Sequence, residues 1–478
     1  MKRLAGMLLV VIRAGRGRAL PLLLLALAAG RFARIEESPL LTVREAQFDH
    51  YQRWQPRSRD NEPVIIVGID SQSLVEHGQW PWPRDLIARL VDRIQAGKPL
   101  AVGVDIVFAE PDRYSPEVLG EHFPGLTSET LAALPDPDGE LAQALERAPS
   151  VLAVVGLSRD LPGARQPSRP LPVYDLNADR DRRLPHFVTA LASRPQLARA
   201  SAGEGLINGS PKLGTADTQR GVLRRMPTLA FIDELPFLSL PLAMVRQALG
   251  EGGTVRLEDG PHGLQAIGIG DYRLPVQPNG ELLLHYGRAS SHYYLSAADV
   301  LAGVHPPDLF AARFVLIGFN STGLQDRVVT PLGESLPGVD IHAQVIESLL
   351  AGEALQRPYW ATWMELGILL ASGLLLIGFL PILRARYAVG GFVALAAMIM
   401  AGGHLAFLAG RYLFDAASLI LLLSPPFISL LGNTLVTGPD PYFDHLFARA
   451  ADACYVSAER VEERLELFRI LLHLQPFT

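Results

Sequence analysis

Two carboxylates in the first half of the chain stand where a parallel sheet presents its ligands. Asp70 ends the apolar run 63–69, and Asp105 lies within a second apolar run, 100–107. Ligands of open α/β sheets bind at the carboxyl ends of parallel strands, where two carboxylates side by side can hold a cation or a cationic ligand. Alternatively, each aspartate accepts backbone N–H groups and fixes the turn after its strand. The sequence leaves both roles open.

Two tryptophans follow the first carboxylate. Trp80 and Trp82 alternate with prolines in a segment that ends at Arg84. Proline restricts the backbone, so the indoles are held rigidly. They form either an aromatic wall for a ligand or dimer partner, or a hydrophobic plug beneath the sheet.

Further polar candidates lie late in the soluble region. His342 stands near the start of a predicted helix, where it acts as a pH sensor or metal ligand, or bonds to the adjoining loop as an ordinary helix-face histidine. Asp326 and Thr330 lie in a long polar loop after the apolar run 314–317; such loops often have a role, but many are purely structural. No spacing indicates a catalytic set, so we expect no catalytic residue, no metal ligand and no cofactor.

Composition narrows the classes of partner. The net charge of -6 provides no basic field, so we expect no nucleic-acid partner. A single cysteine, Cys454, excludes an intrachain disulfide, a cysteine zinc site and a redox pair. We interpret it as a small apolar residue of a helix.

The elements that position these residues follow from apolar periodicity. The runs 63–69 and 100–107 flank a helical pattern at 85–95, which predicts a βαβ unit with parallel strands and a right-handed crossover. Further strands are predicted at 151–155, 281–286 and 314–317, and further helices at 141–147, 239–249, 296–303 and 341–350. The segment 158–194 lacks periodicity and is interpreted as a surface insertion or loop. The predicted fold is therefore an α/β domain with a mixed or parallel sheet covered by helices.

The amino-terminal residues 1–33 indicate membrane insertion. Basic residues precede an uncharged stretch at 19–30, which is typical of a cleaved signal peptide or an uncleaved anchor. We expect an anchor helix with a cytoplasmic amino terminus. Both alternatives place the following soluble region, 34–358, outside the cytoplasm.

Three apolar stretches follow, at about 361–380, 387–409 and 412–431, and predict a bundle of three transmembrane helices over 361–432. Arg384 and Arg386 mark the first connection as cytoplasmic. Glu365, near the outer end of the first helix, is either an intramembrane functional carboxylate or a solvated interfacial one. The remaining segment, 437–478, is predicted to be a cytoplasmic amphipathic or coiled-coil helix that pairs in a dimer or lies along the membrane.

Several short motifs occur in a fixed order along the soluble region. They are 65–70, Ser73, Gly78, the tryptophan-proline segment 80–84, 103–111 with Glu110, 286–287, 296–303, 315–318, Asp326, 330–333 and 337–343. Over 53–358 they resemble the CHASE2 domain, an extracytoplasmic sensory module of bacterial receptors. The candidates for ligand binding or coupling are Asp70, Ser73, Trp80, Trp82, Arg84, Asp105, Glu110, Asp326, Thr330 and His342.

The resemblance implies an amino-terminal membrane helix, the sensor, three membrane helices and a cytoplasmic output domain such as an adenylate cyclase, a diguanylate cyclase or a kinase. No motif of such an output is visible in this chain. We therefore expect a homodimeric receptor of the bacterial inner membrane that detects an unknown extracytoplasmic ligand or envelope protein. The alternatives are a receptor cyclase or kinase whose catalytic domain is missing from this chain, and an envelope scaffold. The stretch 313–352 is predicted to couple the sensor to the membrane, with Asp326 and Thr330 bracing it.

Overall fold

The computed structural model describes residues 18–59, 63–171, 177, 181–209, 221–250, 253–289, 294–306, 308–320 and 327–437. Asp326, Cys454 and the predicted tail helix from residue 438 onward lie outside these residues. The chain divides into two units. The sensor unit consists of Pro39–Trp363 with Gly402–Asp415, and the helical unit consists of Met1–Ser38, Met364–Ala401 and Ala416–Thr478.

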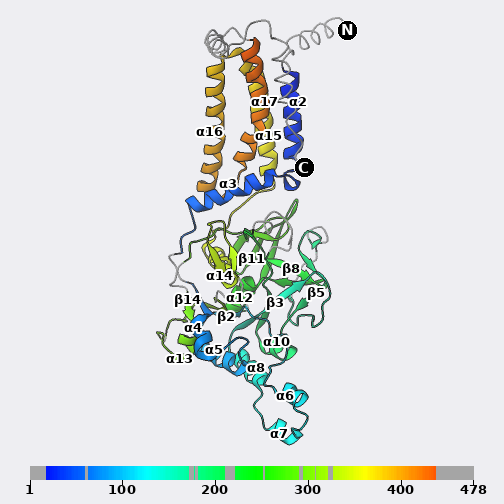
Figure 1. Ribbon diagram of the computed structural model, residues 1–478, viewed down its shortest axis with the longest axis vertical. Helices are drawn as coiled ribbons and strands as arrows, with labels where there is room; N and C mark the ends of the chain where they lie inside the picture. The colour runs from blue at the N-terminus through cyan, green and yellow to red at the C-terminus, as the bar shows by residue number, and fades with distance from the viewer. Residues whose placement is uncertain are drawn as a thin grey trace, which may run out of the picture. The chain divides into compact units, whose positions relative to one another are not determined.

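A seven-stranded sheet forms the centre of the sensor unit (Figure 1). The apolar runs predicted as strands become β1 (Val64–Ile69), β2 (Ala101–Val104), β3 (Ser150–Leu157) and β15 (Phe314–Phe319). β14 (Tyr294–Ser296) and β6 (Gly203–Leu206) add further parallel pairs, and β5 (Thr189–Leu191) pairs antiparallel with β3. The order is β14-β1-β15-β2-β3-β5, with β6 also paired to β3. The sheet is mixed, as expected, but part of the segment predicted as a surface loop, 158–194, contributes β5 to it.

Helices cover both faces of the sheet, which explains why its strands are continuously apolar. Ile65, Val67 and Ile69 pack on one face in a cluster with α5 (Arg84–Ala96), α8 (Pro137–Arg147) and α13 (Ala297–Ala302). Val64 and Ile66 pack on the other face in a cluster with α12 (Leu240–Leu249) and α14 (Gly338–Ala351). Side chains alternate between the faces of a strand, so β1 supplies both cores.

Smaller elements surround this sandwich. Two three-stranded sheets are formed by β10 (Val255–Gly260), β11 (Gly263–Ile269) and β12 (Tyr272–Pro275), and by β4 (His186–Phe187), β8 (Leu229–Ile232) and β9 (Leu235–Leu238). Two-stranded pairs join β13 (Glu281–Leu283) to β7 (Arg225–Pro227), and β16 (Arg327–Val329) to β17 (Ser335–Pro337). The short helices are α4 (Ser71–His77), α6 (Pro116–His122), α7 (Ser128–Ala132) and α10 (Pro195–Ala200). α6 and α7 bury none of their side chains and project beyond α8 and α10 (Figure 1).

One apolar cluster of the sensor unit joins segments from distant parts of the chain. Phe48 and Tyr51 of α3 (Leu40–Trp54) are buried together with Leu283, Leu355, Phe407 and Leu413. Phe407 lies in the last turns of α16 (Ala385–Gly410), which the sensor unit shares with the helical unit. The sensor core therefore includes residues that follow α15 (Ala361–Phe379) in the sequence.

The helical unit contains α2 (Ala19–Phe32), α15 (Ala361–Phe379) from Met364 on, most of α16, and α17 (Ala416–Thr437). Among the described helices, α15 and α16 are long and apolar enough to cross a membrane, while α2 and the apolar part of α17 (Ala416–Gly432) are shorter. This length and composition test therefore supports two of the three predicted spans. Gly373 of α15 has no side chain where Leu25 of α2 approaches, which is typical of close helix packing. Glu365 is buried and not solvated.

Candidate functional site

Asp70 caps a helix at the carboxyl end of β1. One of its carboxylate oxygens, Oδ1, accepts hydrogen bonds from the Ser73 backbone N–H at 2.9 Å and the Ser73 hydroxyl at 2.7 Å. The Ser296 hydroxyl donates to the same oxygen at 2.9 Å. Ser73 is fully buried, and its Oγ also accepts from the backbone N–H of Ala298 at 3.1 Å. Asp70 and Ser73 therefore join the start of α4 to the start of α13, which is the turn-fixing role that the sequence left open.

Asp70→Ala is expected to lower the free energy of unfolding by about 1–2 kcal/mol, because α4 loses its N-cap and two serine hydroxyls lose an acceptor. Urea unfolding followed by circular dichroism measures the change. Asp136→Ala is a matched control, since Asp136 holds the N-cap position of α8 without a side-chain capping bond. Equal midpoints for the two variants would contradict the capping role.

The two tryptophans differ in exposure. Trp82 is 1% exposed, belongs to the core cluster on the α5 face and donates its indole N–H to the Gly78 carbonyl oxygen at 2.8 Å. Trp80 is half-buried and meets the ring of Phe319 edge-on, with 4.9 Å between centroids. Trp82 therefore occupies the position of a hydrophobic plug, and Trp80 packs against the end of β15.

Arg84 is held by several groups at the start of α5. Its backbone N–H donates to Asp112 Oδ2 at 2.7 Å, and its guanidinium lies over the ring of Phe108 at 4.6 Å. Its Nε is 3.8 Å from Asp138 Oδ1, and Arg194 approaches the other oxygen of Asp138 at 3.2 Å. Burial lowers the pKa of Arg84 and raises the pKa of Asp138. This cluster fastens the starts of α5 and α8 to the segment after β2.

Glu110 and Thr330 do not join a common site. Glu110 is exposed, although its charge acts on the pKa of Arg84. Thr330 is 1% exposed in the turn between β16 and β17, where its backbone N–H donates to the Glu334 carbonyl oxygen at 2.9 Å. Among the described residues, its hydroxyl has no hydrogen-bond partner.

Asp105 meets His342. The carboxylate leaves the end of β2, and its Oδ2 lies 3.9 Å from Nε2 of His342 on α14, beyond hydrogen-bond range. Burial lowers the pKa of His342 to about 4, so the imidazole is neutral at pH 7. The other ring nitrogen, Nδ1, is buried and has no partner within the described part of the chain. A bond from His342 to the adjoining loop is therefore absent among these residues.

The topology separates the two carboxylates, which a shared cation site would need side by side. β15 pairs with both β1 and β2 and lies between them. Neighbouring strands are roughly 4.8 Å apart, so Asp70 and Asp105 leave the sheet from strands roughly 10 Å apart. No group of three His, Cys, Asp or Glu side chains within the described ranges is arranged to hold a metal ion.

A polar stripe on α14 is buried against two arginines that precede β1. Glu347 accepts from Arg57 Nη2 at 2.6 Å and from Arg59 Nε and Nη2 at 2.9 and 2.7 Å. Gln344, one turn earlier, accepts from Arg57 Nη2 and the Gly287 backbone N–H, each at 2.9 Å. Asp340 lies 3.6 Å from Arg59 Nη1 and accepts from the hydroxyl of Tyr294. The stripe fixes α14 to the segment between α3 and β1.

A linker (352–360) connects α14 to α15. Gly352 has the left-handed conformation, with φ of 64°, that commonly ends a helix. The Leu355 backbone N–H donates to the Leu283 carbonyl oxygen at 3.2 Å. The Gln356 backbone donates to Arg411 at 3.0 Å and accepts from Leu413 at 2.9 Å. The linker is therefore bonded to β13 on one side and to the α16–α17 connection (411–415) on the other.

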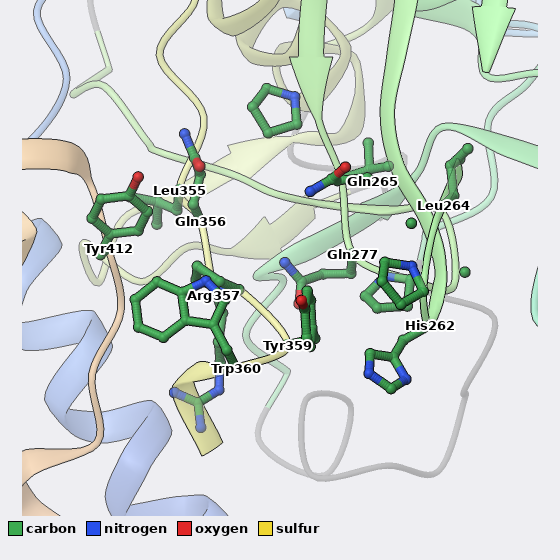
Figure 2. Close-up of a pocket in the computed structure, with 17 residues that line it drawn as sticks. His262, Leu264, Gln265, Gln277, Leu355, Gln356, Arg357, Tyr359, Trp360 and Tyr412 are labelled. Carbon is green, nitrogen blue, oxygen red and sulfur yellow. The ribbon is translucent and has the colours of Figure 1, made fainter. Parts of the chain in front are cut away.

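A pocket of about 210 Å³ opens beside this linker (Figure 2). Its wall comprises the β10–β11 turn, the segment after β12, the linker and Tyr412. The side chains labelled there are mostly aromatic or amide: His262, Gln265, Gln277, Gln356, Tyr359, Trp360 and Tyr412. The rings of His262 and Tyr359 are 4.6 Å apart. No aspartate or glutamate lines this pocket, whose wall lies entirely within the described residues.

Comparison with known families identifies the class of domain. The family model of the CHASE2 domain matches residues 22–380, well over half of the chain. The chain belongs to the CHASE2 domain family. CHASE2 is a sensor domain family, and its domains are typically extracytoplasmic. No curated protein and no solved structure is similar enough to the chain to count as a match.

The buried ion pair of the CHASE2 domain between Arg57 and Glu347 was not among our candidates. Arg57 and Glu347 are 290 residues apart, and neither belongs to a recognisable short motif. The sequence signal lies on the helix: Asp340 and Glu347 are charged residues at positions where the helical spacing predicts a buried face. The pocket residues formed no recognisable motif, because they come from the ends of β11 and β12, the adjoining turns and the linker.

Proposed function

We propose that this chain is a transmembrane receptor whose CHASE2 domain detects an extracytoplasmic cue and passes a shift through the linker to three membrane helices. The shift then reaches the cytoplasmic segment 437–478 or a separate partner protein. Family membership supports the sensor role, and the apolar character of α15 and α16 supports membrane insertion. We further propose that the receptor is a homodimer of the bacterial inner membrane.

The double attachment of the linker carries this proposal. Leu355 is bonded to β13, Gln356 to the α16–α17 connection, and Arg411 Nη2 lies 3.1 Å from Glu353 Oε1. Residue 361 begins α15 directly after the linker. A displacement of the linker therefore acts on α15 through the covalent backbone, and on α16 and α17 through the hydrogen bonds to their connection. Signal transmission requires the cue to favour one of two such packings.

The arrangement of polar segments supports alternating passes through a membrane. The end of α16 and the residues 411–415 belong to the sensor unit, as does the start of α15. Arg384 and Arg386 lie in the connection between α15 and α16, and basic residues favour the cytoplasmic side. In the proposed topology, α15 and α17 cross inward and α16 crosses outward.

Locking the linker tests the proposal. Leu283 and Leu355 form an antiparallel bridge, so Leu283→Cys with Leu355→Cys suits a disulfide. Cys454, the chain's only native cysteine, takes a spin label after the disulfide has formed. In the full chain reconstituted in lipid nanodiscs, we expect the mobility of this label to differ between the oxidised and reduced states.

The control is a disulfide at the far edge of the sheet. Leu157 and Thr189 are also antiparallel partners, in β3 and β5, and have no bond to the linker. Leu157→Cys with Thr189→Cys is expected to leave the Cys454 spectrum unchanged on oxidation. Identical spectra for the oxidised and reduced linker pair would overturn the proposed transmission path.

A further inference from the structure

The contacts described above hold the wall of the pocket beside the linker together but do not fill its space. We propose that it binds a neutral, hydroxyl-rich ligand the size of one sugar ring, either free or at the end of a longer glycan. The additional role of this ligand as the receptor's input rests on the proposed function; the binding itself does not.

The size of the pocket excludes large ligands. Its volume of about 210 Å³ is smaller than the roughly 300–1,000 Å³ of pockets for drug-sized molecules. A volume of this order admits several water molecules or one six-membered ring with its substituents. The pocket therefore fits a single ring better than a peptide segment or a nucleotide.

Three of its polar groups are primary amides without a hydrogen-bond partner among the described residues. Gln265, Gln277 and Gln356 line the pocket, and within the described part of the chain their side chains make no hydrogen bond. Each primary amide offers two N–H donors and a carbonyl acceptor. A hydroxyl both donates and accepts, so a ring with several hydroxyls can pair with amides from three segments at once.

Three aromatic rings give its lining flat apolar faces. Trp360 is 42% exposed and Tyr359 is 44% exposed, although both lie in the sensor unit. Tyr412 and Leu355 lie on the linker side of the same pocket (Figure 2). A sugar ring presents a C–H face that can cover an aromatic ring while its rim meets polar groups, and this combination of large apolar surfaces with a few polar groups is typical of ligand sites.

The charges argue against ionic ligands. The lining contains no carboxylate to bind an ammonium group. Its one permanently charged residue, Arg357, directs its guanidinium to the Leu413 carbonyl oxygen at 2.9 Å and lies 5.8 Å from the ring of Phe48. A phosphate or carboxylate would have to compete with these contacts. A neutral ligand needs no such exchange.

The position of the pocket gives binding a consequence. Gln356, Tyr359 and Trp360 belong to the linker, while Gln265 and Gln277 come from the sheet β10-β11-β12 and its edge. A ligand that pairs with both groups holds the linker against the sensor. It therefore favours one linker position, which is what the proposed transmission requires.

Isothermal titration of the full chain tests the site. The chain is reconstituted in nanodiscs of phospholipid alone, because maltoside and glucoside detergents carry the proposed ligand chemistry. D-glucose and N-acetyl-D-glucosamine are the neutral probes, and inorganic phosphate and choline are the charged ones. We expect saturable heat with at least one sugar, weaker or no heat with phosphate and choline, and a loss of affinity of roughly tenfold or more in Gln277→Leu.

Matched variants keep the result interpretable. Trp360→Ala removes an exposed stacking face and is a second test if Gln277→Leu fails to fold. Trp363→Ala and Gln72→Leu change exposed residues outside the pocket and are expected to bind like the unmodified chain. The site is overturned by the absence of saturable heat with both sugars, by tighter binding of phosphate or choline, or by unchanged affinity in Gln277→Leu and Trp360→Ala.

Failure of the site and failure of the proposed function have different signatures. Absence of sugar binding with a Cys454 spectrum that responds to the linker disulfide overturns the site alone. Saturable sugar binding with an unresponsive spectrum supports the site and overturns the transmission path.

Discussion

Glu347→Gln is expected to lower the free energy of unfolding of the chain by about 3–5 kcal/mol. The side chains of Arg57 and Arg59 are only 2% and 5% exposed, and Glu347 approaches them at 2.6 and 2.7 Å. Removing the carboxylate leaves two guanidinium groups in a buried site with less negative charge to balance them. Glutamine preserves the shape of the side chain, so the loss reports on charge.

The matched control is an exposed pair of the same chemistry. Glu258 meets Arg273 at 2.7 Å, but the two side chains are 43% and 52% exposed. Water already solvates such charges, so Glu258→Gln is expected to cost about 0–1 kcal/mol. Urea titrations of both variants at pH 7, monitored by tryptophan fluorescence, measure the difference. Similar losses for the two variants would mean that burial of the Glu347 pair has no special cost.

Acidification is expected to destabilise the sensor unit through two buried histidines. Burial lowers the pKa of His285 and of His342 from 6.5 to about 4. Between these values the unfolded chain binds protons that the folded chain does not, so the associated stability is complete above pH 6.5 and is lost as the pH falls toward 4. Each pKa unit corresponds to about 1.4 kcal/mol, so burial of each neutral histidine lowers the free energy of unfolding at pH 4 by about 3 kcal/mol relative to its value at pH 7.

A variant isolates this effect from the rest of the acid titration. Buried carboxyls oppose it, since burial raises the pKa of Asp138 and of Glu204 and their cost falls as they gain protons. His342→Leu is therefore expected to change stability little at pH 7 and to exceed the unmodified chain by about 3 kcal/mol at pH 4. The measurement is the urea midpoint as a function of pH. His122→Leu changes an exposed residue of α6 and should have the same urea midpoints as the unmodified chain at each pH. If the curve of His342→Leu against pH runs parallel to that of the unmodified chain, the prediction is wrong.

The central strands and their covering helices could be predicted because local sequence decides them. β1, β3 and β15 are short apolar runs, and a strand covered on both faces needs little more. Apolar residues at helical spacing predict α5 from the sequence. The pairing of strands is different, because the place of β15 between β1 and β2 depends on residues more than 200 positions apart. That insertion is what separates Asp70 from Asp105.

The candidate site was harder to predict because its residues come together only after folding. The helix cap at Asp70 is a local arrangement and was one of the two roles that the sequence allowed. The bonds of Glu347 to Arg57 and Arg59 and the amide pocket depend on pairings across the whole sensor unit. Glutamines and arginines are common on surfaces, so their types alone do not distinguish a buried network from a solvated face.

The boundary of the sensor unit inside α16 bears on how such a domain can be moved between proteins. Phe48 and Tyr51 share their apolar cluster with Phe407 and Leu413, which come after α15 in the sequence. A recombinant fragment that stops at residue 363 would uncover that cluster and the backbone partners of Gln356. Domain exchange, whether by a gene fusion or in the laboratory, would then have to transfer the sensor together with residues 402–415, or supply an equivalent cover for it.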